Sequence, residues 1–412
     1  MAYITGQTEQ GCCLPVKYLG NGAFECEPEV GETHKKHRIF NDYHMFYAKI
    51  VGTPGEAVTI HLKWPQFDPD QVSEEYKQWA SYSTDWPSFF PTVKDVLYYS
   101  ADEIHWTRIE NAQQIEDTVV FTLELPADTV YVCSTLHYTP ANYRNLVKTV
   151  KDSPAVQVLK LGAAWDGADL LSFVATDPNV PNDGKKTIYI QGVQHCHEHT
   201  GAHICDFMLR FLAGDSPKAK ALLKKYIFRI TPVVDMAGWR YGKQTNPLRS
   251  GSIDFNYNRD WGIFSLPEIR AIDAYLNQCM ENGEILAFLA DIHGGTGDEN
   301  DYTSGAGISF DSRATEAVLN QQKRFQDLIR QNCDYLNPLD QGYDCSQKVD
   351  TLFGAYAQQH YGPAYTFEVS MSKIWDRTAG RRFPNSQAAF RRLAEQLAQT
   401  IGQLLDETTE MN

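Results

Sequence analysis

Residues 187–193 read TIYIQGV, and the residues directly after them, 194–199, read QHCHEH. A short apolar run of this kind is typical of a buried β-strand. In open α/β sheets, ligands bind at the carboxyl ends of the strands, where this cluster lies. A catalytic zinc ion takes three protein ligands from His, Cys and carboxylate side chains and keeps one position open. The sequence therefore predicts a metal site directly after this strand.

Two ligand sets are compatible with the cluster. His195 and His197 form an HxH pair, which needs an Asp and then a His downstream in a set order, but Glu198 and His199 come one residue too early. His195 and Glu198 form an HxxE pair, which needs one more His after a later strand. His293 supplies it, because the apolar run 287–292 reads AFLADI and ends there. The second set is the better prediction.

Further motifs follow the HxxE pair in order. Residues 253–261 read IDFNYNRDW and contain an Asn-Arg pair, residues 265–268 read SLPE, and residues 365–368 read YTFE. Together these motifs resemble the zinc metallocarboxypeptidase family, most closely its cytosolic carboxypeptidase branch. The preceding β-rich region is similar to the N-terminal domain of that branch, and the resemblance extends over roughly residues 95–375.

The resemblance implies a role for each matching residue. One Zn²⁺ ion would be held by His195, Glu198 and His293. Glu368 would be the general base, inside a run that itself reads as a buried strand. Asn258 and Arg259 would hold the terminal carboxylate of the substrate. Arg249, or in its place Arg240, would polarise the scissile carbonyl. Tyr343 or Tyr356 would close over the substrate. An Arg fork suits a planar carboxylate because it binds with two parallel hydrogen bonds.

One position departs from the family pattern. The family has Asp two residues before the Asn of the Asn-Arg pair, where it orients a zinc-bound His, and this chain has Asn256. Asn accepts a hydrogen bond but carries no charge, so the His beside it would be less basic. A purely structural alternative also stands for Arg259, which could pair with Asp254 or Asp260.

The pattern of elements changes near residue 140. Before it, the chain reads as short strands with turn residues between them, which predicts an antiparallel β-sandwich over residues 1–140. One helix is expected near residues 73–81. After it, strands and helices alternate, which predicts an α/β catalytic domain over residues 141–412, with a carboxypeptidase-like mixed or parallel sheet flanked by helices. The last helix carries an apolar stripe at helical spacing: Phe390, Leu393, Leu397, Ile401 and Leu404.

The amino-acid composition limits the classes of molecule that the protein is expected to bind. The 412 residues carry a formal charge of −15, which argues against nucleic acid or an anionic membrane as the main partner. The N-terminus has no apolar segment typical of a signal peptide, and the nine cysteines are best interpreted as free thiols. These features predict a cytoplasmic protein, and they leave its oligomeric state open.

The resulting functional prediction is a zinc metallocarboxypeptidase, which hydrolyses a peptide or isopeptide bond at the C-terminus of a peptide or protein by means of zinc-activated water. The alternative is a zinc amidase or deacylase that acts on a small acylated amino acid, since such enzymes share the ligand set. A third possibility, a binding module that has lost catalysis, is disfavoured because Glu368 and all three ligands are present.

Overall fold

The structure is a computed structural model. It describes residues 2–6, 8–10, 13–28, 46–63, 93–241, 256–294, 309–310, 315–336, 343–344 and 351–410. Within these, the chain forms two compact units. The first comprises Met1–Asn142 and Gly238–Phe255, and the second comprises Tyr143–Ala237 and Asn256–Asn412. The second unit omits Gly238–Phe255, which lies inside the predicted catalytic domain; the predicted domain boundary at residue 140 stays a prediction.

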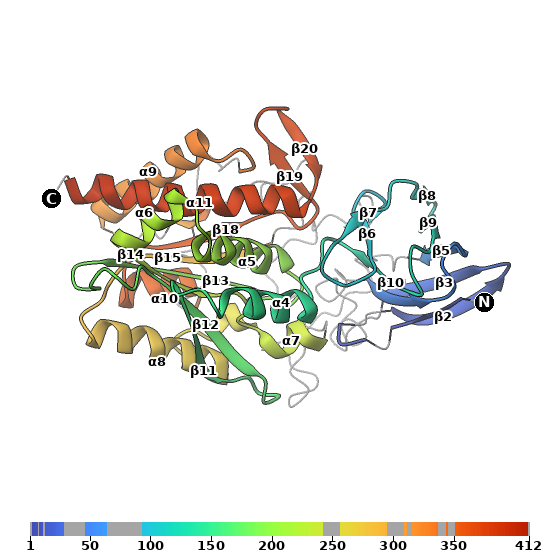
Figure 1. Ribbon diagram of the computed structural model, residues 1–412, viewed down its shortest axis with the longest axis horizontal. Coiled ribbons are helices and arrows are strands. Elements are labelled where there is room, and N and C mark those ends of the chain that lie inside the picture. Colours follow the sequence, from blue (N-terminus) through green and yellow to red (C-terminus); the bar gives the residue numbers. More distant parts are fainter. Residues whose placement is uncertain are drawn as a thin grey trace, which may run out of the picture. The chain divides into compact units, whose positions relative to one another are not determined.

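The first unit contains two five-stranded sheets (Figure 1). One has the order β1-β4-β10-β6-β7 and the other the order β2-β3-β5-β9-β8. Strands such as β5 (Ala57–Lys63) and β9 (Thr118–Glu124) bury every second side chain, which is the pattern of a sheet with one face toward a core. The remaining strands are β1 (Tyr3–Thr5), β2 (Cys13–Gly20), β3 (Ala23–Pro28), β4 (Tyr47–Val51), β6 (Leu97–Ser100), β7 (Thr107–Arg108), β8 (Gln113–Ile115) and β10 (Thr129–Ser134).

The predicted antiparallel character of this unit is confirmed, with one exception. Strands β3 and β5 pair in parallel, with Phe24 opposite Ile60. Parallel neighbours need a long connection between them, and residues 29–45, part of that connection, lie outside the described residues, as does the helix predicted near residues 73–81.

The second unit is built on a six-stranded sheet with the order β11-β12-β14-β13-β15-β18. Its first two strands, β11 (Val156–Ala163) and β12 (Asp169–Ala175), are antiparallel to each other, and β12 is antiparallel to β14. The other four strands run parallel: β14 (Tyr226–Thr231), β13 (Lys186–Gly192), β15 (Ile285–His293) and β18 (Ala364–Glu368). The sheet is therefore mixed, as predicted.

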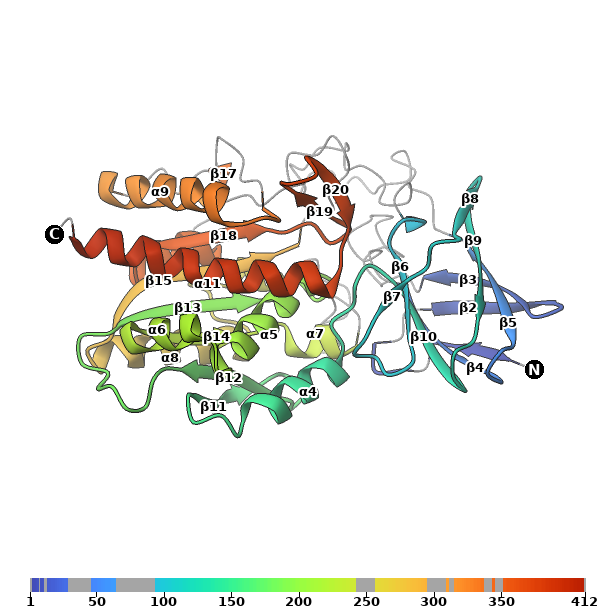
Figure 2. The ribbon, with the colours of Figure 1, turned by 45° about the horizontal axis from the view of Figure 1, so that its top comes forward.

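Helices cover both faces of this sheet (Figures 1 and 2). Phe325 of α9 (Glu316–Asn332) packs against Phe288, whereas Phe353 of α10 (Phe353–His360) packs against Tyr189. Tyr189 pairs with Leu289, the neighbour of Phe288, so these two helices lie on opposite faces. Helix α5 (His199–Ala213) packs on β13 and is covered by α11 (Gln387–Glu410), while α8 (Pro267–Glu281) packs on β11.

The remaining elements lie wholly or partly in the second unit. They are α4 (Pro140–Val150), α6 (Pro217–Lys225), α7 (Met236–Tyr241), the 3-10 helix η4 (Tyr257–Arg259), β16 (Ser309–Phe310), β17 (Tyr343–Asp344), β19 (Lys373–Asp376) and β20 (Arg381–Pro384). Among the described residues, none of the helices has the length and apolarity that a membrane crossing requires.

The direction of the chain reverses at β13. After β13 the chain passes through α5 and α6 to β14 on one side, and it then returns to β15 on the other side. The connections therefore diverge at the carboxyl ends of β13 and β15, which leaves a crevice between them in sheets of this type. The cluster at residues 194–199 and His293 lie at these two strand ends.

Two glycines bring the start of α5 against these strand ends. A Cβ atom on Gly201 would lie 2.4 Å from the carbonyl oxygen of Ile292 and 3.2 Å from the Cα atom of Gly192. Neither backbone neighbour can move without disturbing β13 or β15, so the absence of a side chain at Gly201 sets how closely the helix approaches the sheet.

We expect Gly201→Ala to lower the free energy of unfolding by about 1–3 kcal/mol, because the added methyl forces α5 away from the two strands. Chemical denaturation followed by circular dichroism measures the change. Gly214→Ala, at the other end of the same helix, is the control, since its Cβ would meet its closest neighbours at 3.3 and 3.4 Å. Equal and small effects of both substitutions would show that the close approach at Gly201 is unimportant.

Candidate metal centre

His195, Glu198 and His293 form one group of possible metal ligands. The Glu198 carboxylate lies between the two imidazoles: its Oε1 atom is 2.8 Å from His195 Nδ1, and its Oε2 atom is 2.7 Å from His293 Nδ1. One ligand atom from each residue lies within 4.8 Å of the others. The structure thus brings together the three residues that the HxxE interpretation selects.

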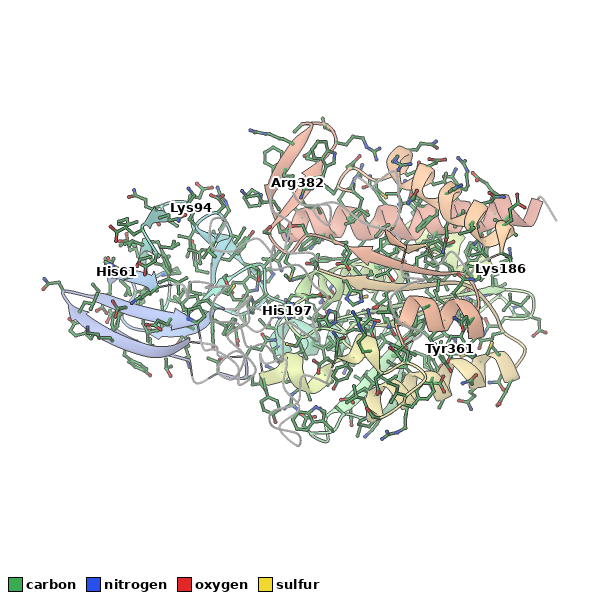
Figure 3. The ribbon with its side chains drawn as sticks, turned by 180° about the vertical axis from the view of Figure 1, so that it is seen from behind. His61, Lys94, Lys186, His197, Tyr361 and Arg382 are labelled. Carbon is green, nitrogen blue, oxygen red and sulfur yellow. The ribbon has the colours of Figure 1, made fainter. Side chains whose placement is uncertain are left out.

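The HxxE residues are held by a turn between β13 and α5, where His197 is labelled in Figure 3. Val193 begins the turn with a φ of 55°, a left-handed conformation that β-branched residues rarely adopt. Its carbonyl oxygen accepts a hydrogen bond from the Asp235 amide, and the Gly192 carbonyl accepts one from Val234. The Glu198 amide donates to the carbonyl of His195. These backbone bonds fix the direction in which the chain leaves the strand.

The second imidazole comes from the neighbouring strand. His293 is the last residue of β15, and it pairs in register with Glu368, the last residue of β18. Residues paired in this way project to the same face of a sheet. Glu368 is half-buried, and the amide that follows it, Val369, donates to the His293 carbonyl. The predicted general base is therefore anchored beside a predicted metal ligand.

The charges of the group suit a cation. Burial alone raises the pKa of Glu198, but the positive charges of His195 and His293 outweigh burial and hold that pKa well below its ordinary value. Burial alone lowers the pKa of His293, but the carboxylates of Asp291 and Glu198 raise it well above its ordinary value. Protons and a metal ion therefore compete for this group, as they do at metal sites generally.

The donor set fits zinc. Two imidazole nitrogens and one carboxylate oxygen are the ligands of many catalytic zinc sites, which bind them at about 2.0–2.2 Å. The side chain of His195 keeps 16% of its surface exposed, whereas those of Glu198 and His293 keep 8% and 2%. His195 is thus the most exposed of the three candidate ligands.

Asn256 contacts the first histidine. Its Oδ1 atom lies 2.9 Å from Nε2 of His195 and accepts a hydrogen bond from the backbone amide of Asn258. The position flagged in the sequence as a departure from the family pattern is therefore in contact with a predicted metal ligand.

The Asn-Arg pair lies next to the same group. The Nδ2 atom of Asn258 is 3.1 Å from His293 Nε2, and its Oδ1 atom accepts from the Phe353 amide. Arg259 donates from Nη1 to the Asn258 carbonyl. The Asp260 carboxylate accepts from Ser265 and from the Leu266 amide, and the structural alternative for Arg259 stays a prediction. Asp254 lies outside the described residues.

No described contact tests the roles of the other predicted site residues. Arg249 and the side chain of Tyr343 lie outside the described residues, although the backbone of Tyr343 forms β17. Arg240 lies in the last turn of α7 and belongs to the first unit, with its guanidinium over the Tyr241 ring. The Tyr356 hydroxyl donates to Asp273, and its ring stacks on His360. The roles of these four residues stay predictions.

Three buried residues that the sequence prediction left out connect to the group. They are Gln194, Asp291 and Trp261. Only Asp291 carried a signal, because Asp and His at positions i and i+2 of a strand share one face. The additional histidine His203 instead packs its ring against Phe207 and Phe390, within the helical layer.

Comparison with known proteins agrees with this geometry. Mouse cytosolic carboxypeptidase 3 is 24% identical over 337 residues, which are 75% of this chain and 33% of that protein. Mouse cytosolic carboxypeptidase 6 is 23% identical over 240 residues, which are 57% of this chain and 43% of that protein. The chain therefore spans a third to under half of the length of these relatives.

Solved structures share the fold over the whole chain. A metallo-carboxypeptidase from Burkholderia cenocepacia has a TM-score of 0.75 at 17% identity and covers 99% of both chains. A metallo-carboxypeptidase from Pseudomonas aeruginosa, in complex with (2-guanidinoethylmercapto)succinic acid, has a TM-score of 0.74 at 17% identity and covers 98% of this chain and 99% of that one.

The profile of one protein family, Peptidase_M14 or zinc carboxypeptidase, matches residues 143–268. This segment contains the HxxE pair and the Asn-Arg pair and ends at Glu268. This segment, the shared fold and the ligand group at the strand ends are the features in which the chain is similar to zinc carboxypeptidases.

Proposed function

We propose that this protein is a zinc carboxypeptidase. It would remove a residue from the C-terminus of a peptide or protein by hydrolysing a peptide or isopeptide bond. The observation that carries the proposal is the His195–Glu198–His293 group at two adjacent strand ends, with Glu368 in register beside His293. Three ligands, one of them partly exposed, next to a carboxylate suit hydrolysis better than a structural site with four protein ligands.

The metal and the carboxylate have separate tasks. His195, Glu198 and His293 would hold a zinc ion, which would lower the pKa of a bound water and polarise a carbonyl oxygen. Glu368 would take the proton of the attacking water and deliver it to the leaving amine. Its place at the end of β18 keeps the carboxylate on the same face as His293, within reach of a substrate there.

The Asn-Arg pair would hold the substrate's free carboxylate. Asn258 is fixed through its amide oxygen by the Phe353 backbone, and Arg259 adds a fork of donors. Arg249, or in its place Arg240, would polarise the scissile carbonyl, and Tyr343 or Tyr356 would close over the substrate. These assignments rest on the family resemblance.

The zinc amidase or deacylase remains the second candidate, although no described contact favours it. Full-length similarity in fold to metallo-carboxypeptidases supports the peptidase.

We propose a cytoplasmic location, because the curated relatives are cytosolic carboxypeptidases.

Hydrolysis assays distinguish the peptidase from the amidase or deacylase. The substrates are peptides with varied C-terminal residues, each also prepared as its C-terminal amide, and acylated amino acids. Cleavage confined to acylated amino acids would contradict the peptidase assignment.

The purified protein should contain about one zinc ion per chain, and His293→Ala should reduce this to a small fraction, because one of three ligands is lost. Mass spectrometry of the metal content measures it. His197→Ala is the matched control. It removes a histidine of the same cluster that is not part of the proposed ligand set, although its Nε2 atom lies 4.0 Å from Glu198 Oε1. Loss of zinc in His197→Ala, with zinc retained in His195→Ala, would overturn the choice of His195, Glu198 and His293 as ligands.

We expect Glu368→Gln to lower kcat by roughly 10²–10⁴-fold while zinc stays bound, because the amide cannot accept the proton of the attacking water. Steady-state hydrolysis of the best peptide in the panel measures the loss. Glu281→Gln, at an exposed position at the end of α8, should leave kcat unchanged. A fully active Glu368→Gln variant would rule out the proposed base.

A further inference from the structure

Asp291 is fully buried on β15, two residues before His293. Side chains at positions i and i+2 of a strand project to the same face. The Oδ2 atom of Asp291 lies 2.6 Å from Nε2 of His293 and also accepts a hydrogen bond from the Gln194 side chain. The sheet thus places a carboxylate directly behind a predicted metal ligand.

The contact with Asp291 determines which nitrogen of His293 is available to a metal. An ionised carboxylate has acceptor atoms alone, so Nε2 must carry the proton of this hydrogen bond. The Nδ1 atom, 2.7 Å from Glu198 Oε2, is then the nitrogen that faces the ligand group. The orientation of the ring and its tautomer are therefore set from behind by Asp291.

His195 is supported differently. Its Nε2 atom contacts the amide oxygen of Asn256, which is identified as oxygen because it also accepts from the Asn258 backbone amide. The amide fixes the same tautomer, with Nδ1 toward Glu198, but it carries no charge. The two histidines are therefore held by a neutral acceptor at His195 and by a carboxylate at His293.

A chain of buried hydrogen bonds holds Asp291 in place. The Trp261 indole donates from Nε1 to Gln194 Oε1 over 2.8 Å. This bond turns the amide nitrogen of Gln194 toward Asp291, to which it donates. Trp261, Gln194 and Asp291 are each at most 1% exposed. The Oδ2 atom of Asp291 therefore has two partners, Gln194 and His293, which hold it more firmly than a single contact would.

We propose that Asp291 is the positioning residue of the metal centre: it supplies, behind His293, the charged support that Asn256 does not supply behind His195. A doubly charged cation would then face two carboxylates, Glu198 as a ligand and Asp291 through the imidazole of His293. The proposal rests on the proposed function, because it requires that the His195–Glu198–His293 group binds zinc.

A structural role for Asp291 makes a different prediction. A buried carboxylate that only completes the packing of β15 would change stability when it is altered, and zinc affinity would fall no more than folding requires. A charged support for His293 changes zinc affinity in a folded protein, and the loss is recovered when a carboxylate is placed behind the other histidine.

The test compares Asp291→Asn, Asn256→Asp and the double variant, each as the full chain. Zinc affinity is measured by competition with a chelator, and visible absorption of the cobalt(II)-substituted proteins reports the ligand field. Asp291→Asn keeps an acceptor oxygen and loses the charge, so its zinc affinity should fall roughly 10–100-fold. The double variant should recover most of this loss, and its cobalt spectrum should again resemble that of the wild type.

A milder variant covers the case in which Asp291→Asn does not fold. Trp261→Phe keeps the Asp291 charge but removes the donor that orients Gln194, and it should weaken zinc binding by a few-fold while circular dichroism stays unchanged. An Asp291→Asn affinity within about threefold of the wild type, or a double variant no better than Asp291→Asn, would overturn the proposal. Absence of zinc binding by the wild type would instead overturn the proposed function, and this inference with it.

Discussion

One interaction organises the candidate metal centre: the Glu198 carboxylate lies between the Nδ1 atoms of His195 and His293. The three residues come from a turn after β13 and from the end of β15, so the group forms only when these strands pair in register. That register is continuous to β18, where Glu368 pairs with His293. A shift by one residue would turn His293 and Glu368 to the opposite face of the sheet.

The surrounding backbone is adapted to this interaction. Gly201 allows α5 to approach the ends of β13 and β15 closely, and Val193 takes a left-handed conformation that redirects the chain toward His195. Strained conformations of this kind persist where the surrounding structure holds them, and they are often found at functional sites. Behind the histidines, Asn256 and Asp291 fix the ring nitrogens that face Glu198. The ligand geometry is thus determined by contacts outside the ligands themselves.

The sequence was sufficient to predict the elements and residues that carry a local signal. Helix α11 has the predicted apolar stripe because its period is visible in the sequence. The HxxE pair and His293 could be found because each follows an apolar strand. The parallel pairing of β3 with β5 and the Trp261–Gln194–Asp291 chain could not be predicted, because they join residues distant in sequence. Such contacts depend on packing, which no local pattern encodes.

The central claim is that two histidines and one glutamate hold a zinc ion, and X-ray absorption at the zinc edge of the purified protein tests it most directly. The account predicts two imidazole nitrogens and one carboxylate oxygen, with at least one further light ligand, at about 2.0–2.2 Å. Cys196 is the buried thiol closest in sequence to the ligands. A sulfur ligand at about 2.3 Å, or a shell without imidazole scattering, would contradict the account.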